Sequence, residues 1–501
     1  MNPHLTMKID PTTPIPTLPR IGPVLWVAIA AGVVTVALLI AHNLAGGAHA
    51  DAPVEVHLPP AWYIGILPFV GILAAIAFMP LIPATHHWWE SNLNRLVVSM
   101  ICAACTVVYA FLVGGLHHAG TVLEHAIVTE YIPFIVLLFS LYVISGGISL
   151  RGDLPAHPGT NTGFLAFGAI IASFIGTTGA SMLLIRPLLK TNSERKHVVH
   201  TVIFFIFLVS NIGGTLLPIG DPPLFLGYLY GVPFFWTFKL LPEWAVCCAI
   251  LLVVYFIWDT LAYRRENKAD LRIDEAMRQP LSISGFSNAF WMLGVVLSVA
   301  FISPGKEVPL LGFKAFPFLR EILMLTFVAL SLKSTPAGVR EYNRFNYAAI
   351  LEVAALFIGI FVAMQIPLEV LRASGERITA VMGEPWHFFW ATGSLSSFLD
   401  NAPTYVVFFQ LGQTMHGGGM DMLTLESAAG GAIAVPLLAA ISLGAVFMGA
   451  MTYIGNGPNF MVKAIAEQSG IRMPSFFGFM FRYSIPILVP TFIVITVLFL
   501  L

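Results

Sequence analysis

Long apolar stretches recur along this chain, and the polar positions between them are spaced as in a membrane protein. The hydrocarbon core of a bilayer is about 30 Å thick, so a helix that crosses it needs about 20 mostly apolar residues. By this criterion, spans are predicted at 22–44, 61–82, 94–115, 130–150, 198–230, 240–262, 287–303, 316–332, 346–366, 430–463 and 480–501. The pattern predicts an all-α integral membrane protein with about 11 transmembrane helices.

Two further apolar segments, 163–189 and 386–412, are each divided in the middle by polar residues. A helix rises 1.5 Å per residue, so each arm of these segments is too short to cross the hydrocarbon core alone. We therefore predict two re-entrant hairpins, each of which enters and leaves the membrane on one side.

Two of the predicted spans carry nearly the same polar interruption. Residues 219–225 read Ile-Gly-Asp-Pro-Pro-Leu-Phe and residues 454–460 read Ile-Gly-Asn-Gly-Pro-Asn-Phe, with four of the seven positions identical. Lipid offers no hydrogen bonds, so such a break persists only where protein groups or a water-filled cavity satisfy the freed backbone. One Gly-Pro break is as often a simple kink or turn. Two matched breaks, each preceded by a divided hairpin, favour the binding site of a transporter.

The charges in the loops set the predicted topology. The basic residues beside the first hairpin and in the two polar loops after it are Arg151, Lys190, Arg195, Lys196, Arg265, Lys268, Arg272 and Arg340. The positive-inside rule places these loops in the cytoplasm. The predicted spans fit this placement only if 163–189 does not cross. The N-terminus is then inside, the C-terminus is outside, and the two hairpins open from opposite faces, which is an inverted-topology repeat.

We expect one folded unit made of five successive parts. They are N-terminal helices for scaffolding or dimerisation at 1–129, a first repeat at 130–263, a cytoplasmic linker at 264–280, scaffold helices at 281–345 and a second repeat at 346–501. Each repeat holds one hairpin and one broken helix, the latter at 198–230 and 430–463. The first apolar run ends in Ala-His-Ala at 48–50, which resembles a signal-peptidase site, but its length favours an uncleaved helix.

The composition agrees with this class and excludes several others. Of 501 residues, 57% are hydrophobic and only 10% are charged, against roughly 25% charged in soluble domains. The formal net charge of -1 leaves no basic domain for nucleic acid. The four cysteines lie in apolar segments and imply neither a disulfide framework nor a metal site. We find no spacing of nucleophile and base, or of metal ligands, that would indicate an enzyme.

Acidic residues inside the predicted membrane segments are the main candidates for chemistry. Asp221 lies in the first broken helix and Asp400 at the tip of the second hairpin. The neutral candidates that can offer oxygen to a cation are Asn211, Thr215, Asn401, Asn456, Asn459, Thr178 and Ser181. Carboxylate, amide and carbonyl oxygens suit a hard cation such as sodium. Removal from water disfavours a charged carboxylate, so sodium and protons can compete for it.

Two other ionisable residues lie within apolar segments. Glu352 is a third candidate for proton coupling, although a buried structural pair is an equal alternative. Arg186 lies near the end of a hairpin arm. It can pair with an anion or with Asp221, but extension of its side chain to the membrane surface is the default interpretation.

At these residues the chain resembles the ion transporter superfamily. This group includes D-type sodium/proton antiporters, arsenite efflux pumps, citrate-metal symporters and sodium-coupled dicarboxylate transporters. Residues 210–221, Ser-Asn-Ile-Gly-Gly-Thr-Leu-Leu-Pro-Ile-Gly-Asp, resemble a stretch of the antiporter branch. Residues 399–403, Leu-Asp-Asn-Ala-Pro, are similar to the hairpin tip of the antiporter and arsenite branches. The likeness extends from residue 131 to the C-terminus and is closest to an antiporter-like or citrate transporter branch.

The resemblance implies two inward-pointing hairpins, two unwound helices, a site at the membrane midplane and a homodimer that moves by an elevator mechanism. It also implies the inner membrane of a bacterium. The chain departs from the sodium-dicarboxylate branch, because neither hairpin tip carries the Ser-Asn-Thr signature of that branch. The negative charge of Asp400 at the second tip would repel a multiply charged anion.

These observations lead to a predicted function. We expect a sodium/proton antiporter in which Asp400 and Asp221 bind sodium or a proton alternately, with no cofactor beyond the transported ions. The alternative is a cation-coupled citrate or dicarboxylate symporter, and arsenite efflux comes third.

Overall fold

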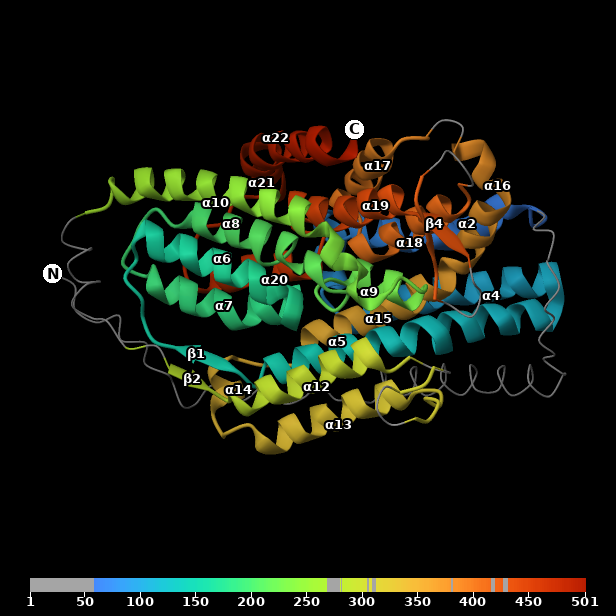
Figure 1. The fold of residues 1–501 in the computed structure, drawn as a ribbon, viewed down its shortest axis with the longest axis horizontal. Helices are drawn as coiled ribbons and strands as arrows, with labels where there is room; N and C mark the ends of the chain where they lie inside the picture. Colours follow the sequence, from blue (N-terminus) through green and yellow to red (C-terminus); the bar gives the residue numbers. More distant parts are fainter. Residues whose placement is uncertain are drawn as a thin grey trace.

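The structure is a computed structural model. It describes residues 58–267, 280, 282–303, 306–308, 312–379, 382–415, 420–426 and 431–501. Three predicted features lie outside the described residues. They are the span 22–44, the Ala-His-Ala sequence at 48–50 and most of the linker 264–280. The described part is mainly helical (Figure 1). Two small antiparallel sheets were not predicted, β1 (Ser149–Arg151) with β2 (Ser282–Ser284) and β3 (Met422–Thr424) with β4 (Ala432–Ala434).

The chain reverses twice before the first hairpin. Helix α2 (Trp62–Phe78) is followed by the short α3 (Pro83–Trp89) at an angle of 101°. Helix α4 (Asn92–Leu123) contains a non-helical residue, Gly115, with φ 68° and ψ -163°. The chain then continues through the π-helix η1 (Glu124–Tyr131) into α5 (Ile132–Ser145). Because only glycine adopts this φ without strain, the reversal falls at Gly115, where the predicted span 94–115 ends.

Contacts with α15 (Ala348–Ala363) and α16 (Gln365–Thr379) confirm that the chain turns back. Arg95 pairs with Glu352, and further along α4 His118 pairs with Glu369. On the return leg, the hydroxyl of Tyr142 donates to the carbonyl of Asn346, just before α15 begins. The two legs of the chain therefore pack along α15 in opposite directions.

The first hairpin consists of α6 (Pro158–Ile175) and α7 (Thr177–Thr191), joined at Gly176. Its two outer ends meet, because Asn161 and Asn192 exchange amide hydrogen bonds of 2.8 and 3.0 Å. Helix α6 has 18 residues, and by length and apolar composition it is one of the helices that could cross a membrane. The prediction that each arm is too short to cross the membrane is therefore wrong for α6. The hydrogen bonds between Asn161 and Asn192 nevertheless show that α6 and α7 form a hairpin.

The second hairpin has the same plan. Helix α17 (Pro385–Phe398) and helix α18 (Asn401–Gln413) pack against each other. Leu399 and Asp400 form the tip between them.

Both predicted helix breaks are present. The first separates α8 (Val199–Leu208) and the 3-10 helix η2 (Ile212–Leu216) from α9 (Pro222–Leu229). The second separates α19 (Val435–Met448) and η4 (Gly449–Met451) from α20 (Gly457–Gln468).

The two breaks share their backbone geometry. Asp221 has φ -145° and ψ 143°, and Asn456 has φ -152° and ψ 140°. A Cβ atom at Gly455 would lie 2.6 Å from the carbonyl oxygen of Gly449, and one at Gly220 would collide with that of Gly214. Glycine is required at both places because two backbone segments touch there.

The remaining described helices pack around these elements. They are η3 (Phe234–Leu240), α10 (Leu241–Tyr263), α12 (Ser287–Phe301), α13 (Leu319–Ser334), α14 (Val339–Tyr342), α21 (Phe476–Phe479), η5 (Met480–Ser484), α22 (Ile485–Ile495) and η6 (Thr496–Leu500).

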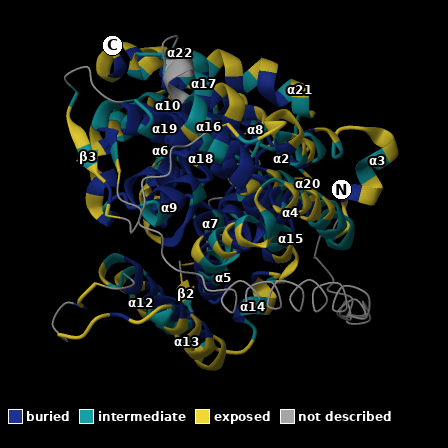
Figure 2. Cartoon of the chain, turned by 90° about the vertical axis from the view of Figure 1, so that its right-hand side faces the viewer, coloured by how far each residue is buried: buried dark blue, intermediate teal, exposed yellow. Residues whose placement is uncertain are grey.

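Inter-helix contacts divide the molecule into two groups. The outer group contains α2, α4, η1, α5, α12, α13 and α15, and the hairpin group contains both hairpins, both broken helices, α10 and α22. Figure 1 shows α12 and α13 along one side of the molecule and α10 and α22 along the opposite side. Figure 2 shows the buried residues concentrated around α9, α18 and α19, in the hairpin group. Helix α16 contacts both groups.

Within the described residues, six helices are long and apolar enough to cross a membrane, or seven if α2 and α3 form one bent span. Two shorter apolar helices, Ser287–Phe301 and Val435–Met451, fall below that length. The larger predicted number, about 11, counted apolar runs through the breaks that shorten these helices. It remains a prediction.

Candidate cation site at four helix tips

The polar tips of both hairpins and both broken helices meet at the carboxylate of Asp221. One oxygen, Oδ1, accepts hydrogen bonds from the hydroxyl of Thr177 at 2.8 Å and from Nδ2 of Asn456 at 2.9 Å. The other, Oδ2, accepts from Nδ2 of Asn401 at 2.6 Å. Asp221 is only 1% exposed, and its three donors are equally buried. We call these four residues the tip cluster.

The helices that begin at the tip cluster explain how a buried carboxylate is tolerated. Helices α7, α18 and α20 begin at Thr177, Asn401 and Gly457, and α9 begins directly after Asp221. The N-terminus of a helix carries a partial positive charge and free N–H groups. Four such ends converge here, and together they favour the negative charge of Asp221. Within the described structure, no basic side chain hydrogen-bonds to this carboxylate.

The two hairpin-and-break units also share their hydrogen bonds. Ser173 in the first hairpin donates to the carbonyl oxygen of Gly213 at 2.5 Å, and Ser397 in the second donates to that of Met448 at 3.1 Å. Ser173 and Ser397 are 224 positions apart, as are the two tip residues that hold Asp221, Thr177 and Asn401. The correspondence therefore extends from the backbone to the side chains.

A second set of amides joins the two breaks. Asn211 donates to Oδ1 of Asn459 at 2.7 Å, and Asn459 donates to the carbonyl oxygens of Gly449 and Thr452 at 2.9 Å each. Asn456 also donates to the carbonyl oxygen of Ser210 at 3.1 Å. These bonds satisfy backbone carbonyls that the unwound segments leave without helical partners.

Two buried amide oxygens at the site accept no hydrogen bond within the described structure, Oδ1 of Asn211 and Oδ1 of Asn401. Both residues lie beside Gly449, where a Cβ atom would be 3.1 Å from Asn211 Oδ1 and 3.6 Å from Asn401 Nδ2. The carbonyl oxygen of Gly455 is 3.3 Å from the same point. Asn211 Oδ1 and the carbonyl oxygen of Gly455 therefore lie near one point, and neutral oxygens of this kind are suitable ligands for a hard cation.

Comparison with known proteins identifies the family. A family model described as "Putative citrate transport" matches residues 57–500. The chain belongs to this family. No curated protein matches it. The family fits the citrate transporter-like branch of the ion transporter superfamily, one of the two branches that the sequence resemblance left open. A membrane transporter is the class of function that it supports.

Asp400 occupies a different position from Asp221 in this citrate transport family member. Its carboxylate accepts a 3.0 Å hydrogen bond from the backbone N–H of Ala402 and so caps α18. It is half-buried. The sequence treated the two acids as equivalent cation ligands, whereas the structure places Asp221 at the centre of the tip cluster and Asp400 beside it.

Other predicted residues have local partners. Thr215 donates to the carbonyl oxygen of Ile212 in its own 3-10 helix, and the hydroxyl of Ser181 bonds that of Ser210 at 2.8 Å. Thr178 is half-buried. Glu352 forms its 2.8 Å ion pair with Arg95, between two helices of the outer group.

Arg186 lies on α7 near Tyr142 and Arg344. Its Nη1 atom is buried and donates no hydrogen bond to any partner within the described residues.

Thr177 was not among the predicted site residues, although it donates to Asp221 as directly as Asn401 does. An alignment of the two hairpin sequences at their tips would have identified Thr177. Thr177 and Asn401 are each the first residue of the second arm.

One group of side chains has metal-binding geometry, although the sequence predicted no metal site. Ligand atoms of His86, His87 and Glu90, on or next to the short helix α3, lie within 4.8 Å of one another. The group is largely exposed and does not overlap the tip cluster. Within this group, Nδ1 of His86 already lies 2.8 Å from the carbonyl oxygen of Pro80.

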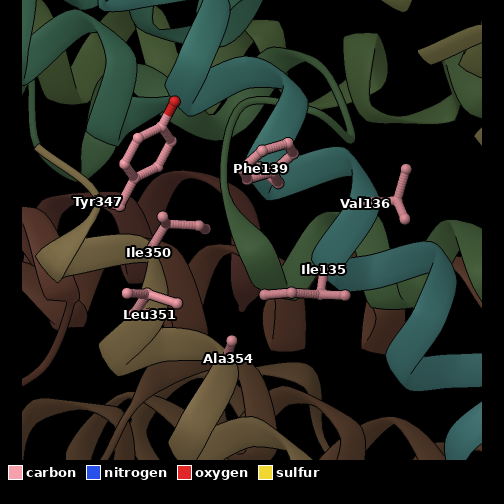
Figure 3. Close-up of a pocket in the computed structure, with 7 residues that line it drawn as sticks. All are labelled: Ile135, Val136, Phe139, Tyr347, Ile350, Leu351 and Ala354. Carbon is pink, nitrogen blue, oxygen red and sulfur yellow. The ribbon is translucent and has the colours of Figure 1, made fainter. Parts of the chain in front are cut away.

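A cavity of about 320 Å³ lies between α5 and α15 (Figure 3). Its lining residues are Ile135, Val136, Phe139, Tyr347, Ile350, Leu351 and Ala354. Apart from the Tyr347 hydroxyl this wall is apolar, so it suits hydrocarbon rather than an ion. The tip cluster remains the candidate functional site.

Proposed function

We propose that this protein is a secondary active transporter that binds its coupling cation, Na⁺ or H⁺, at Asp221. The observation that carries the proposal is a single buried carboxylate held by three neutral donors from both hairpin-and-break units. A carboxylate with neutral partners carries one unbalanced charge, which one monovalent cation neutralises. The unpaired amide oxygens of Asn211 and Asn401 supply further neutral ligands for Na⁺.

The arrangement also supports an inverted repeat and an elevator movement. The two hairpin-and-break units share hydrogen bonds and meet at one site, as in transporters built from inverted repeats. In our proposal the hairpin group carries the site across the membrane as one body. The outer group stays in place and forms the contact between two protomers.

We propose citrate or a related carboxylate as the transported solute. The sequence alone ranked sodium/proton antiport first, and we reverse that order because the family is described as "Putative citrate transport". The four converging helix N-termini support an anionic solute once the cation has neutralised Asp221. Antiport remains the second candidate, because the acidic Asp400 next to Asn401 opposes the binding of an anion.

The test uses protein reconstituted in liposomes that contain a pH-sensitive dye. Labelled citrate and succinate are offered with sodium, lithium or potassium, and then each cation is offered without an organic acid. We expect carboxylate uptake that depends on sodium or on a proton gradient. A dye response to sodium alone, with no carboxylate uptake, would establish antiport instead.

Asp221→Asn is expected to lower cation-coupled transport at least about 100-fold, because it removes the only charge in the tip cluster, a change of several kcal/mol for a buried ion site. Asp400→Asn should cost much less, since Asp400 caps a helix. Glu352→Gln, which changes an acid outside the hairpin group, is the matched control. Full coupled transport by Asp221→Asn would remove this residue from the mechanism.

A further inference from the structure

Two histidines and a glutamate meet at the turn between α2 and α4, outside the tip cluster. Nε2 of His86 is 3.3 Å from Oε1 of Glu90, and Nδ1 of His87 is 3.5 Å from Oε2 of the same carboxylate. We call these three residues the turn cluster. The side chains of His86, His87 and Glu90 are 43%, 88% and 61% exposed, so an ion from solution can reach them.

The helical backbone of α3 brings the three side chains together. Residues three and four apart are neighbours on the surface of a helix. Glu90 is the C-cap of α3, three positions after His87 and four after His86. The two imidazole rings lie at 67° to each other, with centroids 5.4 Å apart. Each ring therefore brings one nitrogen near a different oxygen of the carboxylate.

A hydrogen bond to the backbone determines which nitrogen of His86 can bind an ion. Nδ1 lies 2.8 Å from the carbonyl oxygen of Pro80. A carbonyl oxygen only accepts, so Nδ1 carries the proton of the neutral ring and Nε2 holds a lone pair. Histidines that bind metals have this arrangement, in which one ring nitrogen donates to a carbonyl and the other binds the ion.

The neutral ring leaves two acceptors close together. Nε2 of His86 and Oε1 of Glu90, 3.3 Å apart, both present lone pairs. A positive species between them makes this contact favourable. A second proton on the ring provides one, but His87 faces the same carboxylate and needs a proton of its own. One divalent cation serves both rings while each stays neutral.

The separations in the turn cluster fit a small tetrahedral ion. Zinc binds imidazole nitrogen and carboxylate oxygen at about 2.0–2.2 Å, so two of its ligands are about 3.3–3.6 Å apart. The two separations from the rings to the carboxylate are 3.3 and 3.5 Å, and ligand atoms of all three residues lie within 4.8 Å of one another. Imidazole suits zinc and neighbouring transition metals, whereas Mg²⁺ and Ca²⁺ prefer oxygen ligands.

The end of α3 favours a cation for an independent reason. The C-terminus of a helix carries a partial negative charge, so an acidic side chain is unfavourable there. Glu90 occupies this position, and a cation bound to it complements the helix end. Helix α3 also has only 7 residues, too few to be stable by themselves. An ion bound across its last turn therefore stabilises it.

Contacts on both sides of the turn cluster hold the backbone that presents the ligands. The hydroxyl of Thr85 donates to the carbonyl oxygen of Met79 at 2.8 Å, across the bend from α2. Trp89 is only 3% exposed. The amide of Asn94 in α4 donates to the carbonyl oxygen of Trp88 at 2.7 Å. The three ligands are therefore placed before an ion arrives, as a metal site requires.

We propose that the turn cluster binds one divalent transition-metal ion of the class of Zn²⁺. Its ligands are Nε2 of His86, Nδ1 of His87 and the carboxylate of Glu90, and a fourth position is open to water. The bound ion stabilises the turn between α2 and α4 of the outer group. This site is separate from the cation site proposed at Asp221 and does not depend on the proposed function.

Zinc binding is measured in purified protein from which metals and the affinity tag have been removed, because a histidine tag binds zinc itself. Zinc is titrated in competition with a chromophoric chelator. We expect one ion per protein, which an excess of Mg²⁺ or Ca²⁺ does not displace. If no zinc binds, or if Mg²⁺ displaces it, the proposal is wrong.

Variants assign the ion to the turn cluster. His86→Ala, His87→Ala and Glu90→Gln each remove one ligand at an exposed position. Loss of an outer-shell partner alone typically weakens metal binding about 10- to 100-fold, so we expect each variant to lose at least about tenfold in zinc affinity. His117→Ala, which removes another exposed histidine near the far end of α4, is the matched control and should bind zinc normally. Unchanged affinity in the ligand variants would place the ion elsewhere and overturn the proposal.

Hydrogen exchange measured by mass spectrometry tests whether the ion stabilises the turn. At a zinc concentration about ten times the dissociation constant, opening that releases the ion becomes about tenfold rarer. We therefore expect about tenfold slower exchange in peptides that cover 83–92, and no change in peptides from 158–175 of the first hairpin. Zinc should have no effect on either region in Glu90→Gln. Equal exchange of 83–92 with and without zinc in the unchanged protein would contradict the stabilising role.

Discussion

At the scale of single residues, Asp221 depends on short polar side chains that reach it from other elements. Thr177 and Asn401 approach from the two hairpin tips, and Asn456 approaches from the opposite break. A hydrogen bond to a charged group contributes roughly 1.5–3 kcal/mol. Three such bonds from separate helix ends fix the position of the carboxylate at which we propose that the cation binds.

The two adjacent threonines of the first tip offer a matched comparison. Thr177→Val keeps the shape of the side chain but removes the hydroxyl that donates to Asp221. We expect the apparent affinity for the coupling cation to change roughly tenfold or more. Thr178→Val, at the half-buried neighbouring position, should change it little. Affinity is measured from the cation dependence of uptake, and equal effects of the two substitutions would contradict the role of Thr177.

At the scale of elements, the base of the first hairpin is fixed to α10. Arg195 and Asp259 form a fully buried ion pair at 2.6 Å, and His200 lies 2.8 Å from the same carboxylate oxygen. Asn161 at the start of α6 donates to the other oxygen at 3.1 Å. The sequence assigned Arg195 to a charged cytoplasmic loop, whereas the structure shows it buried and paired. These contacts join α6, the end of α7 and the start of α8 to α10.

The helix breaks depend on glycine where two backbone segments touch. Gly220→Ala places a methyl group against the carbonyl oxygen of Gly214, and overpacking of this kind costs typically 1–3 kcal/mol. We expect a lower melting temperature in detergent and a loss of transport. Gly457→Ala is the matched control, because a Cβ atom there meets nothing within 4 Å. If the two variants melt at the same temperature, the close approach in the first break is not required.

At the scale of the whole molecule, the hairpin group contacts the outer group along limited surfaces. Helix α7 packs on α5, and Tyr228 of α9 donates to the carbonyl oxygen of Val299 in α12. Helix α16, which contacts both groups, packs on α18. The rigid-body movement that we propose requires these contacts between the groups to change.

A reversible cross-link between the groups tests this movement. A Cβ atom at Gly179 of α7 would lie 3.1 Å from Cβ of Ser145 in α5, so the helices need to part only slightly to reach the roughly 3.5–4.5 Å of a disulfide. With the four free native cysteines replaced, we expect oxidation of the Ser145→Cys/Gly179→Cys variant to stop transport and reduction to restore it. Each single cysteine variant serves as control. Full transport by the oxidised pair would show that the groups do not move apart at this contact.

The sequence by itself determined the membrane class, the two divided helical hairpins and the two broken helices, and it singled out Asp221 as a candidate. These follow from local chemistry, because apolar runs, Gly-Pro breaks and buried acids are visible in the order of residues. Tertiary structure decided which side chains meet. Thr177, Asn401 and Asn456 are far apart in sequence and converge only because four helices end at one point. It also separated Asp400 from Asp221 and paired Glu352 with Arg95. A single sequence does not encode such pairings locally, since they depend on how distant helices pack.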